Sequence, residues 1–339
     1  MPNSPIPHVR WGIVGASDIA DRVMAPAMRA SSSAELVAVA SRSPERARAF
    51  ADRHEVARTY ESAEALASDP DVDAIYVATE VDRHLADVLA AARAGKDVLV
   101  EKPIARTAAE GQEMVDACAV AGVRLGTCFY QRYNTRHLRI RELTATGRIG
   151  RVVTATLNFS GRSPEREGAW RQDPRRSGGG SFIDSASHCV DLLRFLFGEV
   201  RQVAAFTATL AAGYAVEDTA TAILWLDGDV HATISAHWST TDPSDARSSV
   251  IAVGGSEGTI VSWPLHDKFS RGTLLVADAT GEEEIPLPEA STHVALLDDW
   301  AARRAAGLPP AITGADGVAA QRVVDAVYES GRSGRMVTL

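Results

Sequence analysis

A lysine that follows a short apolar run is the strongest candidate in this chain for a residue that acts on a ligand. Val98–Val100 has the pattern of a strand buried on both faces, and it ends abruptly at Glu101 and Lys102. Charged side chains at the carboxyl end of such a strand point into the crevice where open α/β sheets bind ligands. Only three of the 35 Lys and Arg residues are Lys. A lysine at this position therefore indicates a function that needs a compact, rotatable charge, which arginine does not supply. The alternative is a surface ion pair between Glu101 and Lys102 that closes the strand.

A second candidate combines a carboxylate with an imidazole. Asp184 and His188 are four residues apart in the stretch 183–197, which predicts a helix, so both lie on one helix face. An aspartate beside a histidine orients the ring and tunes its pKa, as a general acid or base requires. The preceding Gly178–Gly180 allows the backbone to turn sharply or to pass close to a bulky group. Standing alone, the pair is better explained by a helix-capping aspartate and a core histidine.

The turn after the first predicted strand has the features of a dinucleotide site. Gly15, Ser17 and Ala20 occupy the positions where the fingerprint needs a tight turn, a close approach to pyrophosphate and a close helix–strand contact. Ser17 replaces the usual glycine, and its hydroxyl is able to bond a phosphate oxygen. The amides at the helix start, from Asp18 and Ile19, would meet the negative charge.

The end of the second predicted strand indicates which dinucleotide binds. An acidic residue there would bond a ribose 2′-hydroxyl, whereas an arginine accommodates a 2′-phosphate. The chain has no acid at this point and instead presents Ser41, Arg42 and Arg46. A hydroxyl with two guanidinium groups suits phosphate, so the sequence favours NADP over NAD. The alternative is that the two arginines are solvated charges on a helix.

The elements that carry these residues predict an α/β protein with two domains. Up to residue 129 the chain alternates short apolar runs with helical patterns, which predicts a doubly wound parallel sheet and an NADP-binding Rossmann domain. The expected strands are 9–14, 35–40, 73–78, 98–100 and 124–129. Between residues 200 and 287 the chain is mostly strand-like, which predicts a large, mostly antiparallel open sheet. We therefore expect a second α/β domain, 130–339.

Composition excludes several functional classes. The 339 residues have an ordinary globular composition, and the net charge of −9 argues against non-specific nucleic-acid or membrane binding. No apolar run approaches the ~18 residues of a spanning helix, and the N-terminus lacks the apolar core of a signal peptide. Three scattered cysteines, Cys118, Cys128 and Cys189, indicate no disulfide framework and fit the cytoplasm. A metal site built on His188 would need His231, His237 or Cys189, whose spacing does not support it, so we expect none.

Several segments, taken together and in order, resemble the Gfo/Idh/MocA oxidoreductases. They are Gly12–Ala20, Ala78–Thr79 with His84, Gly95–Pro103, Trp170–Arg171 and Gly178–Gly198. Proteins of this family join a Rossmann domain to an α/β domain whose open sheet commonly mediates oligomerisation, so the resemblance implies a homodimer or homotetramer. Within the family, Gly15–Ser17, Ser41 with Arg46, and Val216–Asp218 look most like NADP-dependent 1,5-anhydrofructose reductases.

The resemblance also implies roles for individual residues. Lys102 is expected beside the nicotinamide and the substrate, and His188 is expected to give or take the proton, aided by Asp184. Further contacts are implied to the cofactor from Thr79, His84 and Glu101, and to the substrate from Tyr130, Trp170 and Arg171.

The predicted activity is hydride transfer between a nicotinamide and a hydroxyl or carbonyl carbon of a sugar, anhydro-sugar or polyol. The protein would supply orientation and electrostatics for chemistry that belongs to the cofactor. Two other hypotheses remain open on this fold. One is a non-catalytic NADP sensor or partner-binding protein, and the other is an enzyme that internally recycles a tightly held NAD.

Overall fold

The computed structural model describes residues 8–239 and 249–339. The chain forms two compact units. The first comprises the chain up to Phe129 together with His293–Val318, and the second comprises Tyr130–Thr292 and Ala319–Leu339. The predicted division, 1–129 and 130–339, differs at residues 293–318, which pack with the first unit.

The sheet of the first unit has six parallel strands in the order β3-β2-β1-β4-β5-β6. This order and the connecting helices are those of a Rossmann fold, which confirms the predicted fold class. The strands are β1 (Val9–Val14), β2 (Ala34–Ala40), β3 (Arg58–Tyr60), β4 (Ala74–Val77), β5 (Asp97–Val100) and β6 (Leu125–Thr127). The sequence analysis missed β3, because three residues at the sheet edge carry no clear period. Every residue of β4 and β5 is buried, as their unbroken apolar runs predict.

Three helices of the first unit begin at residues whose side chains cap the helix. The hydroxyl of Ser43 accepts a hydrogen bond from the Arg46 amide at 3.3 Å, and that of Thr107 accepts one from the Glu110 amide at 3.2 Å. The helical segment that follows β1 begins at Asp18 and contains a wide π-helical turn, Ala20–Met24, before α1. The helices are α1 (Ala25–Ala30), α2 (Pro44–His54), α3 (Ala63–Ala67), α4 (Val81–Arg93) and α5 (Ala108–Ala121).

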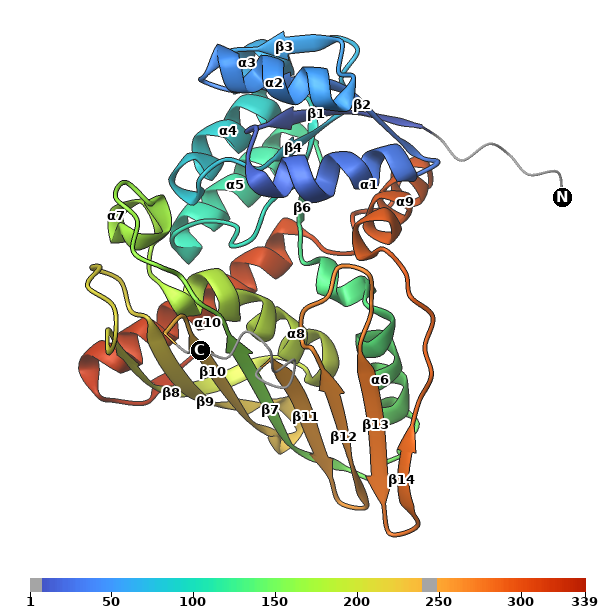
Figure 1. The fold of residues 1–339 in the computed structure, drawn as a ribbon, viewed down its shortest axis with the longest axis vertical. Helices are drawn as coiled ribbons and strands as arrows, with labels where there is room; N and C mark the ends of the chain where they lie inside the picture. Colours follow the sequence, from blue (N-terminus) through green and yellow to red (C-terminus); the bar gives the residue numbers. More distant parts are fainter. Residues whose placement is uncertain (1–7, 240–248) are drawn as a thin grey trace, which may run out of the picture. The chain divides into compact units, whose positions relative to one another are not determined.

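A helix from the C-terminal part of the chain completes this unit. Helix α9 (Thr292–Ala305) lies beside α1 (Figure 1). Its Trp300 ring lies 5.6 Å from that of Trp11 on β1, measured between centroids, and both rings are buried. Because aromatic pairs bury large apolar areas, this contact gives a physical reason for residues 293–318 to join the first unit.

The second unit contains a nine-stranded sheet in the order β14-β13-β12-β11-β7-β10-β9-β8-β15. Only β7 and β10 pair in parallel, so the predicted, mostly antiparallel sheet is confirmed. The strands are β7 (Val152–Ser160), β8 (Val200–Ala208), β9 (Thr219–Leu226), β10 (His231–His237), β11 (Val250–Gly255), β12 (Gly258–Trp263), β13 (Thr273–Asp278), β14 (Gly281–Glu284) and β15 (Val337–Thr338). The short strands β14 and β15 were not predicted.

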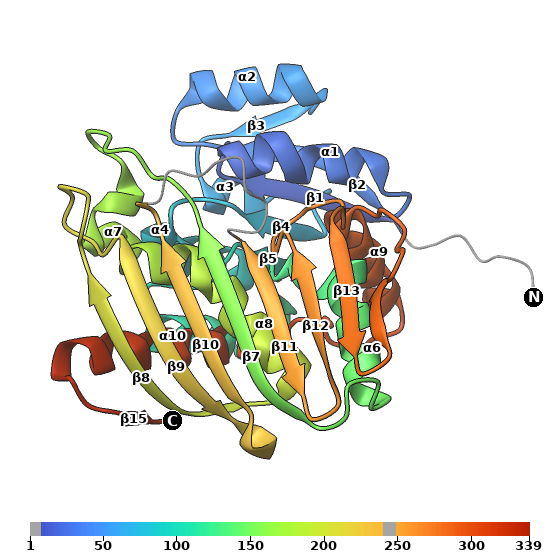
Figure 2. The same ribbon diagram turned by 60° about the horizontal axis from the view of Figure 1, so that its bottom comes forward.

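One face of this sheet is covered by helices and the other is not. Figure 2 shows α6 (Thr135–Ala145), α8 (Ser187–Phe197) and α10 (Gly314–Ser333) behind the strands. Alternate residues of β9 are buried, as expected for a strand with one covered face.

Three further properties of the described residues bear on the predictions. None of their helices combines the length and apolarity that crossing a bilayer requires. They contain no group of three or more His, Cys, Asp or Glu side chains arranged to hold a metal ion. All three cysteines are buried thiols, and burial raises the pKa of each.

Candidate active site

The predicted cofactor residues of the first unit follow the carboxyl ends of four neighbouring strands. The Gly15 amide after β1 donates to the Ala40 carbonyl at the end of β2, at 2.9 Å. The Ala78 amide after β4 donates back to Val14 on β1 at 2.8 Å, and the Glu101 amide after β5 donates to β4 at 2.9 Å. These bonds align the four strand ends, so the segments that leave them share one edge of the sheet. Ligands bind at this edge in open α/β sheets.

The turn after β1 fits a dinucleotide phosphate. Gly15 has φ +103°, and a Cβ there would lie 2.7 Å from the carbonyl oxygen of Ala78, so only glycine is accommodated. The Ser17 Oγ is buried and has no hydrogen-bond partner among the described residues. A buried hydroxyl without a partner is costly, and a phosphate oxygen would satisfy it. Asp18 and Ile19 follow directly, at the start of the helical segment.

The residues predicted to hold the 2′-phosphate lie on the adjacent turn. The Ser41 amide donates to the Tyr60 carbonyl at 3.0 Å, and its hydroxyl accepts from the Ser43 amide at 3.3 Å. The Arg42 side chain is 71% exposed, and its Nη2 lies 4.0 Å from a carboxylate oxygen of Glu80. Arg46 is exposed in the first turn of α2. A hydroxyl and two solvent-facing guanidinium groups therefore border the strand edge.

His84 is buried and bonds backbone carbonyl groups of two neighbouring segments. Its ring is completely buried, with Nε2 3.2 Å from the Thr79 carbonyl and Nδ1 3.1 Å from the Ile104 carbonyl. Burial lowers the pKa of His84, so the ring is neutral and donates to one carbonyl at a time. The hydroxyl of Thr79 donates to Asp87 at 2.7 Å. These contacts join the segments after β4 and β5, and the buried ring of His84 offers no surface to a ligand.

Glu101 anchors the segment that carries Lys102. Its side chain accepts hydrogen bonds from the Tyr76 hydroxyl and, at 3.1 Å, from the Lys102 amide. Glu101 is only 6% exposed, and burial raises the pKa of its carboxyl group. The alternative of a surface ion pair is therefore wrong for Glu101. Its carboxylate instead holds the backbone of Lys102 through the hydrogen bond from the Lys102 amide.

In the second unit, Asp184 and His188 come from one short helical stretch. The turn Phe182–Ala186 is π-helical and continues directly into α8. The His188 residue is 5% exposed, whereas the Asp184 side chain is 24% exposed and reaches the surface. Arg171 donates from Nε to Asp184 at 3.3 Å, and its guanidinium lies 4.3 Å from the centroid of the Trp170 ring. Of the residues predicted to contact the substrate, Arg171 therefore bonds the predicted catalytic carboxylate directly, and Trp170 lies against Arg171.

Aromatic rings surround His188. The Tyr130 ring is 5.0 Å away in an edge-on arrangement, and the His266 ring is 4.8 Å away, both measured between centroids. Two residues after Tyr130, the Nη2 of Arg132 donates to the buried Asp191 on α8 at 2.6 Å, which bonds this segment to α8. The sequence analysis missed His266. Its only local signal is its proximity to the end of β12, and the pairing with α8 is a long-range event.

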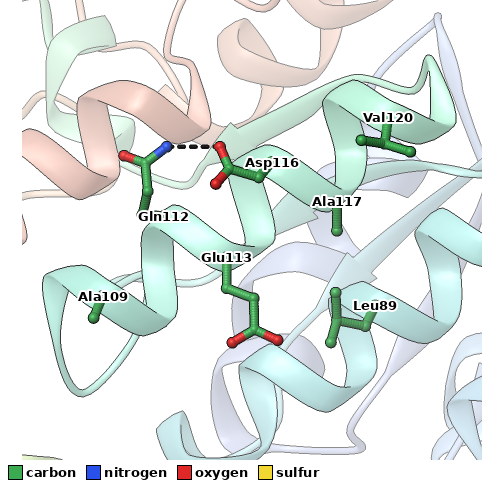
Figure 3. A pocket seen from close by; sticks show the side chains of 7 residues that line it. All are labelled: Leu89, Ala109, Gln112, Glu113, Asp116, Ala117 and Val120. Atoms are coloured by element: carbon green, nitrogen blue, oxygen red, sulfur yellow. Dashed lines mark hydrogen bonds between the residues drawn. The ribbon is translucent and has the colours of Figure 1, made fainter.

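A shallow hollow on the first unit lies apart from these residues. It is formed by α4 and α5, and its lining includes Leu89, Glu113 and Val120 (Figure 3). The bond drawn there joins the Gln112 amide group to Asp116 at 2.9 Å. The hollow contains none of the predicted site residues and is not part of the candidate site.

Comparisons with known proteins assign both units. The model of the oxidoreductase family with an NAD-binding Rossmann fold matches residues 9–129, and that of the GFO/IDH/MocA C-terminal domain matches residues 137–261. The chain is 33% identical over 91% of its length to 1,5-anhydro-D-fructose reductase of Ensifer adhaerens, covering 92% of that protein. It is 30% identical over 97% of its length to D-xylose 1-dehydrogenase (NADP(+)) 2 of Haloferax volcanii, covering 99% of it.

A solved structure agrees over the same span. The aldose-aldose oxidoreductase of Caulobacter crescentus, crystallised with glycerol, superposes with a TM-score of 0.90 at 26% identity, covering 98% of this chain and 100% of that one. The first unit is therefore an NAD(P)-binding Rossmann domain, as predicted. With both domain models matched in order, the chain belongs to the Gfo/Idh/MocA family of oxidoreductases.

Proposed function

We propose that this protein is an NADP(H)-dependent oxidoreductase that interconverts a hydroxyl and a carbonyl group on a sugar, anhydro-sugar or polyol. The observation that carries the proposal is the grouping, at the start of α8, of a nearly buried imidazole, a carboxylate held by an arginine, and aromatic rings. Such a surface suits a small polyhydroxylated molecule, because rings cover its C–H faces and charged groups bond its hydroxyls. The substrates named for the two relatives described above are an anhydro-sugar and a sugar, in agreement with this.

In this proposal His188 transfers the proton. In the direction of reduction it donates a proton to the carbonyl oxygen, and in oxidation it accepts the proton of the hydroxyl. Asp184, held by Arg171, supplies a negative charge on the same helical stretch. Tyr130 and Trp170 contact the substrate through their rings.

Lys102 stabilises the negative charge that develops on the substrate oxygen, a task for which a preorganised cation is effective. When bound, NADP(H) supplies or accepts the hydride. Gly15 and Ser17, with the amides of Asp18 and Ile19, hold the pyrophosphate, and Ser41, Arg42 and Arg46 hold the 2′-phosphate. Thr79 borders the same edge.

The proposal includes an assembled, cytoplasmic form. The uncovered face of the second sheet presents Phe206 at 84%, Ile223 at 59% and Trp225 at 39% exposure. The residues facing the same side on β9 and β10 are threonine, serine and histidine, without a charged side chain. An apolar face of this kind favours burial against a second copy, as in a homodimer or homotetramer.

The test separates binding from chemistry. Purified Lys102→Met and His188→Gln variants are titrated with NADPH by fluorescence, and turnover is followed by NADPH absorbance with 1,5-anhydro-D-fructose, D-xylose and levoglucosan. We expect both variants to retain NADPH affinity within about twofold and to lose at least 100-fold in kcat, in the range for general acid–base groups. Loss of NADPH binding in both would overturn the assignment. Tight NADPH binding by the wild type without turnover of any probe would favour a non-catalytic sensor.

A further inference from the structure

Glu217, two residues before β9, and Tyr328, on α10, make contacts that the proposed reaction does not use. We propose that both are positioning residues, which hold the start of the helix that carries the proposed acid–base pair. This inference rests on the proposed function. It concerns the four amides that any helix leaves without an internal partner at its N-terminus.

Glu217 receives three consecutive amides of this helix start. Its carboxylate accepts from the amide of Gly180 at 2.8 Å and from that of Phe182, also at 2.8 Å. Its backbone carbonyl accepts from the amide of Ser181 at 3.0 Å. One residue more than 30 positions away along the chain thus makes the hydrogen bonds that a local N-cap residue usually makes. Its negative charge lies where the helix dipole favours it.

Tyr328 receives the fourth amide. Its hydroxyl accepts from the Ile183 amide at 3.2 Å and donates to the Glu217 carboxylate at 2.9 Å. The next amide, that of Asp184, makes the first bond within the helix, to the Gly180 carbonyl at 3.1 Å. The helix start is therefore complete immediately before the first residue of the acid–base pair. We call Glu217 and Tyr328 together the helix clamp.

The clamp explains the glycines that precede the helix. A Cβ on Gly179 would lie 2.1 Å from the Tyr328 hydroxyl, and one on Gly180 would lie 2.0 Å from the Glu217 carbonyl oxygen. Both distances are far below any real contact. The bulky group that the triple glycine predicts is therefore the clamp itself, approaching the backbone closely enough to bond its amides.

The clamp bonds the helix start about one turn before His188, so a change in the clamp should alter the orientation of His188. Burial raises the pKa of Glu217, and the amides and the Tyr328 hydroxyl oppose that effect. Replacing the carboxylate with an amide leaves one acceptor oxygen for two N–H donors and adds a donor that faces them. The first turn would then loosen, and His188, one turn later, would lose its fixed direction. Small displacements of a catalytic group reduce turnover more than binding.

The experiment compares Glu217→Gln and Tyr328→Phe with a matched control, Tyr60→Phe. The control removes an equivalent tyrosine bond to a carboxylate, Tyr60 to Asp69 at 2.9 Å, in the first unit. Tyr328→Phe deletes a single oxygen and keeps the ring beside Phe182, so it folds even where Glu217→Gln does not. Amide hydrogen exchange is measured by mass spectrometry on the peptide that covers 178–188, without any ligand. Kinetics use NADPH and 1,5-anhydro-D-fructose.

We expect exchange in this peptide to accelerate at least tenfold in both clamp variants and to remain unchanged in the control. The value of kcat should fall at least tenfold while the Kd of NADPH stays within twofold. Unchanged exchange, or faster exchange with unchanged kcat, would overturn the proposal. A wild type inactive on the probe sugar would contradict the proposed substrate class, and the exchange measurement would then decide the clamp by itself.

Discussion

Removal of the two arginines beside Ser41 tests the cofactor preference. The side chain of Arg42 is 71% exposed and Arg46 is exposed, so each bond to a 2′-phosphate is formed in a largely aqueous setting. Hydrogen bonds to charged groups contribute about 1.5–3 kcal/mol, and exposed ion pairs contribute less than about 1 kcal/mol. We therefore take about 1 kcal/mol for each arginine, which is about a fivefold change in Kd.

Fluorescence titration with NADPH and NADH measures this effect. Arg42→Ala and Arg46→Ala should each weaken NADPH about fivefold, and the double variant about 30-fold if the two contributions add. NADH affinity should not change, because NADH has no 2′-phosphate. The preference should shrink at 1 M salt, where the Debye length is about 3 Å. Arg48→Ala is the matched control, since Arg48 is also exposed on α2 but points away from positions 42 and 46.

Glu80 provides the opposite perturbation. Its carboxylate lies 4.0 Å from Arg42 and competes with a phosphate for that guanidinium. Glu80→Gln should therefore tighten NADPH binding by a factor of about two to five, as expected for an exposed pair. Equal weakening of NADPH and NADH binding in the arginine variants, or no weakening at all, would refute the reasoning. Both arginines would then be solvated charges on a helix.

Three other predictions follow from single positions. Gly15→Ala should weaken NADPH and NADH alike by at least tenfold in fluorescence titration, because its Cβ would lie 2.7 Å from the Ala78 carbonyl at φ +103°; unchanged affinity would contradict the tight turn. Burial lowers the pKa of His137 to about 3, below the unfolded value near 6.5, so stability should fall as pH drops from 6.5, by up to about 1.4 kcal/mol per pH unit. Urea unfolding at pH 7 and pH 5 should show this loss diminished in His137→Gln, and an identical loss in both proteins would exclude His137 as its source. Phe206→Asp should lower the oligomeric state in sedimentation, whereas Val120→Asp, 91% exposed on α5, should not; an assembly unaffected by Phe206→Asp would place the interface elsewhere.

Much of the first unit was predictable, because its signals are local. Apolar runs indicate strands buried on both faces. Ser43 and Thr107 are capping residues, and each bonds an amide three residues later at the start of its helix. Gly15 likewise predicts a tight turn from its residue type and its place directly after a strand. The edge strand β3 was missed because three residues are too few to show a period.

The sequence was sufficient to predict which residues belong to the candidate site. It was less informative about what those residues contact. His84 and Glu101 were expected at the cofactor, but the structure buries both and uses them to hold backbone. Arg171 was expected as a pocket wall, and it also holds Asp184. Each of these outcomes depends on which surface of a side chain is covered, which the sequence around that residue does not encode.

The sequence by itself determined the family, the strand–turn–helix of the cofactor site and the identity of Lys102, Asp184 and His188 as candidates, because spacing and residue type are sufficient for these. Only the tertiary structure decided what surrounds them. The Glu217 carboxylate reaches the helix start from 35 and 37 residues away, and the Tyr328 hydroxyl reaches it from 145 residues away. Partners at such separations meet because the sheet and helices bury their apolar faces together, and no local pattern records the result.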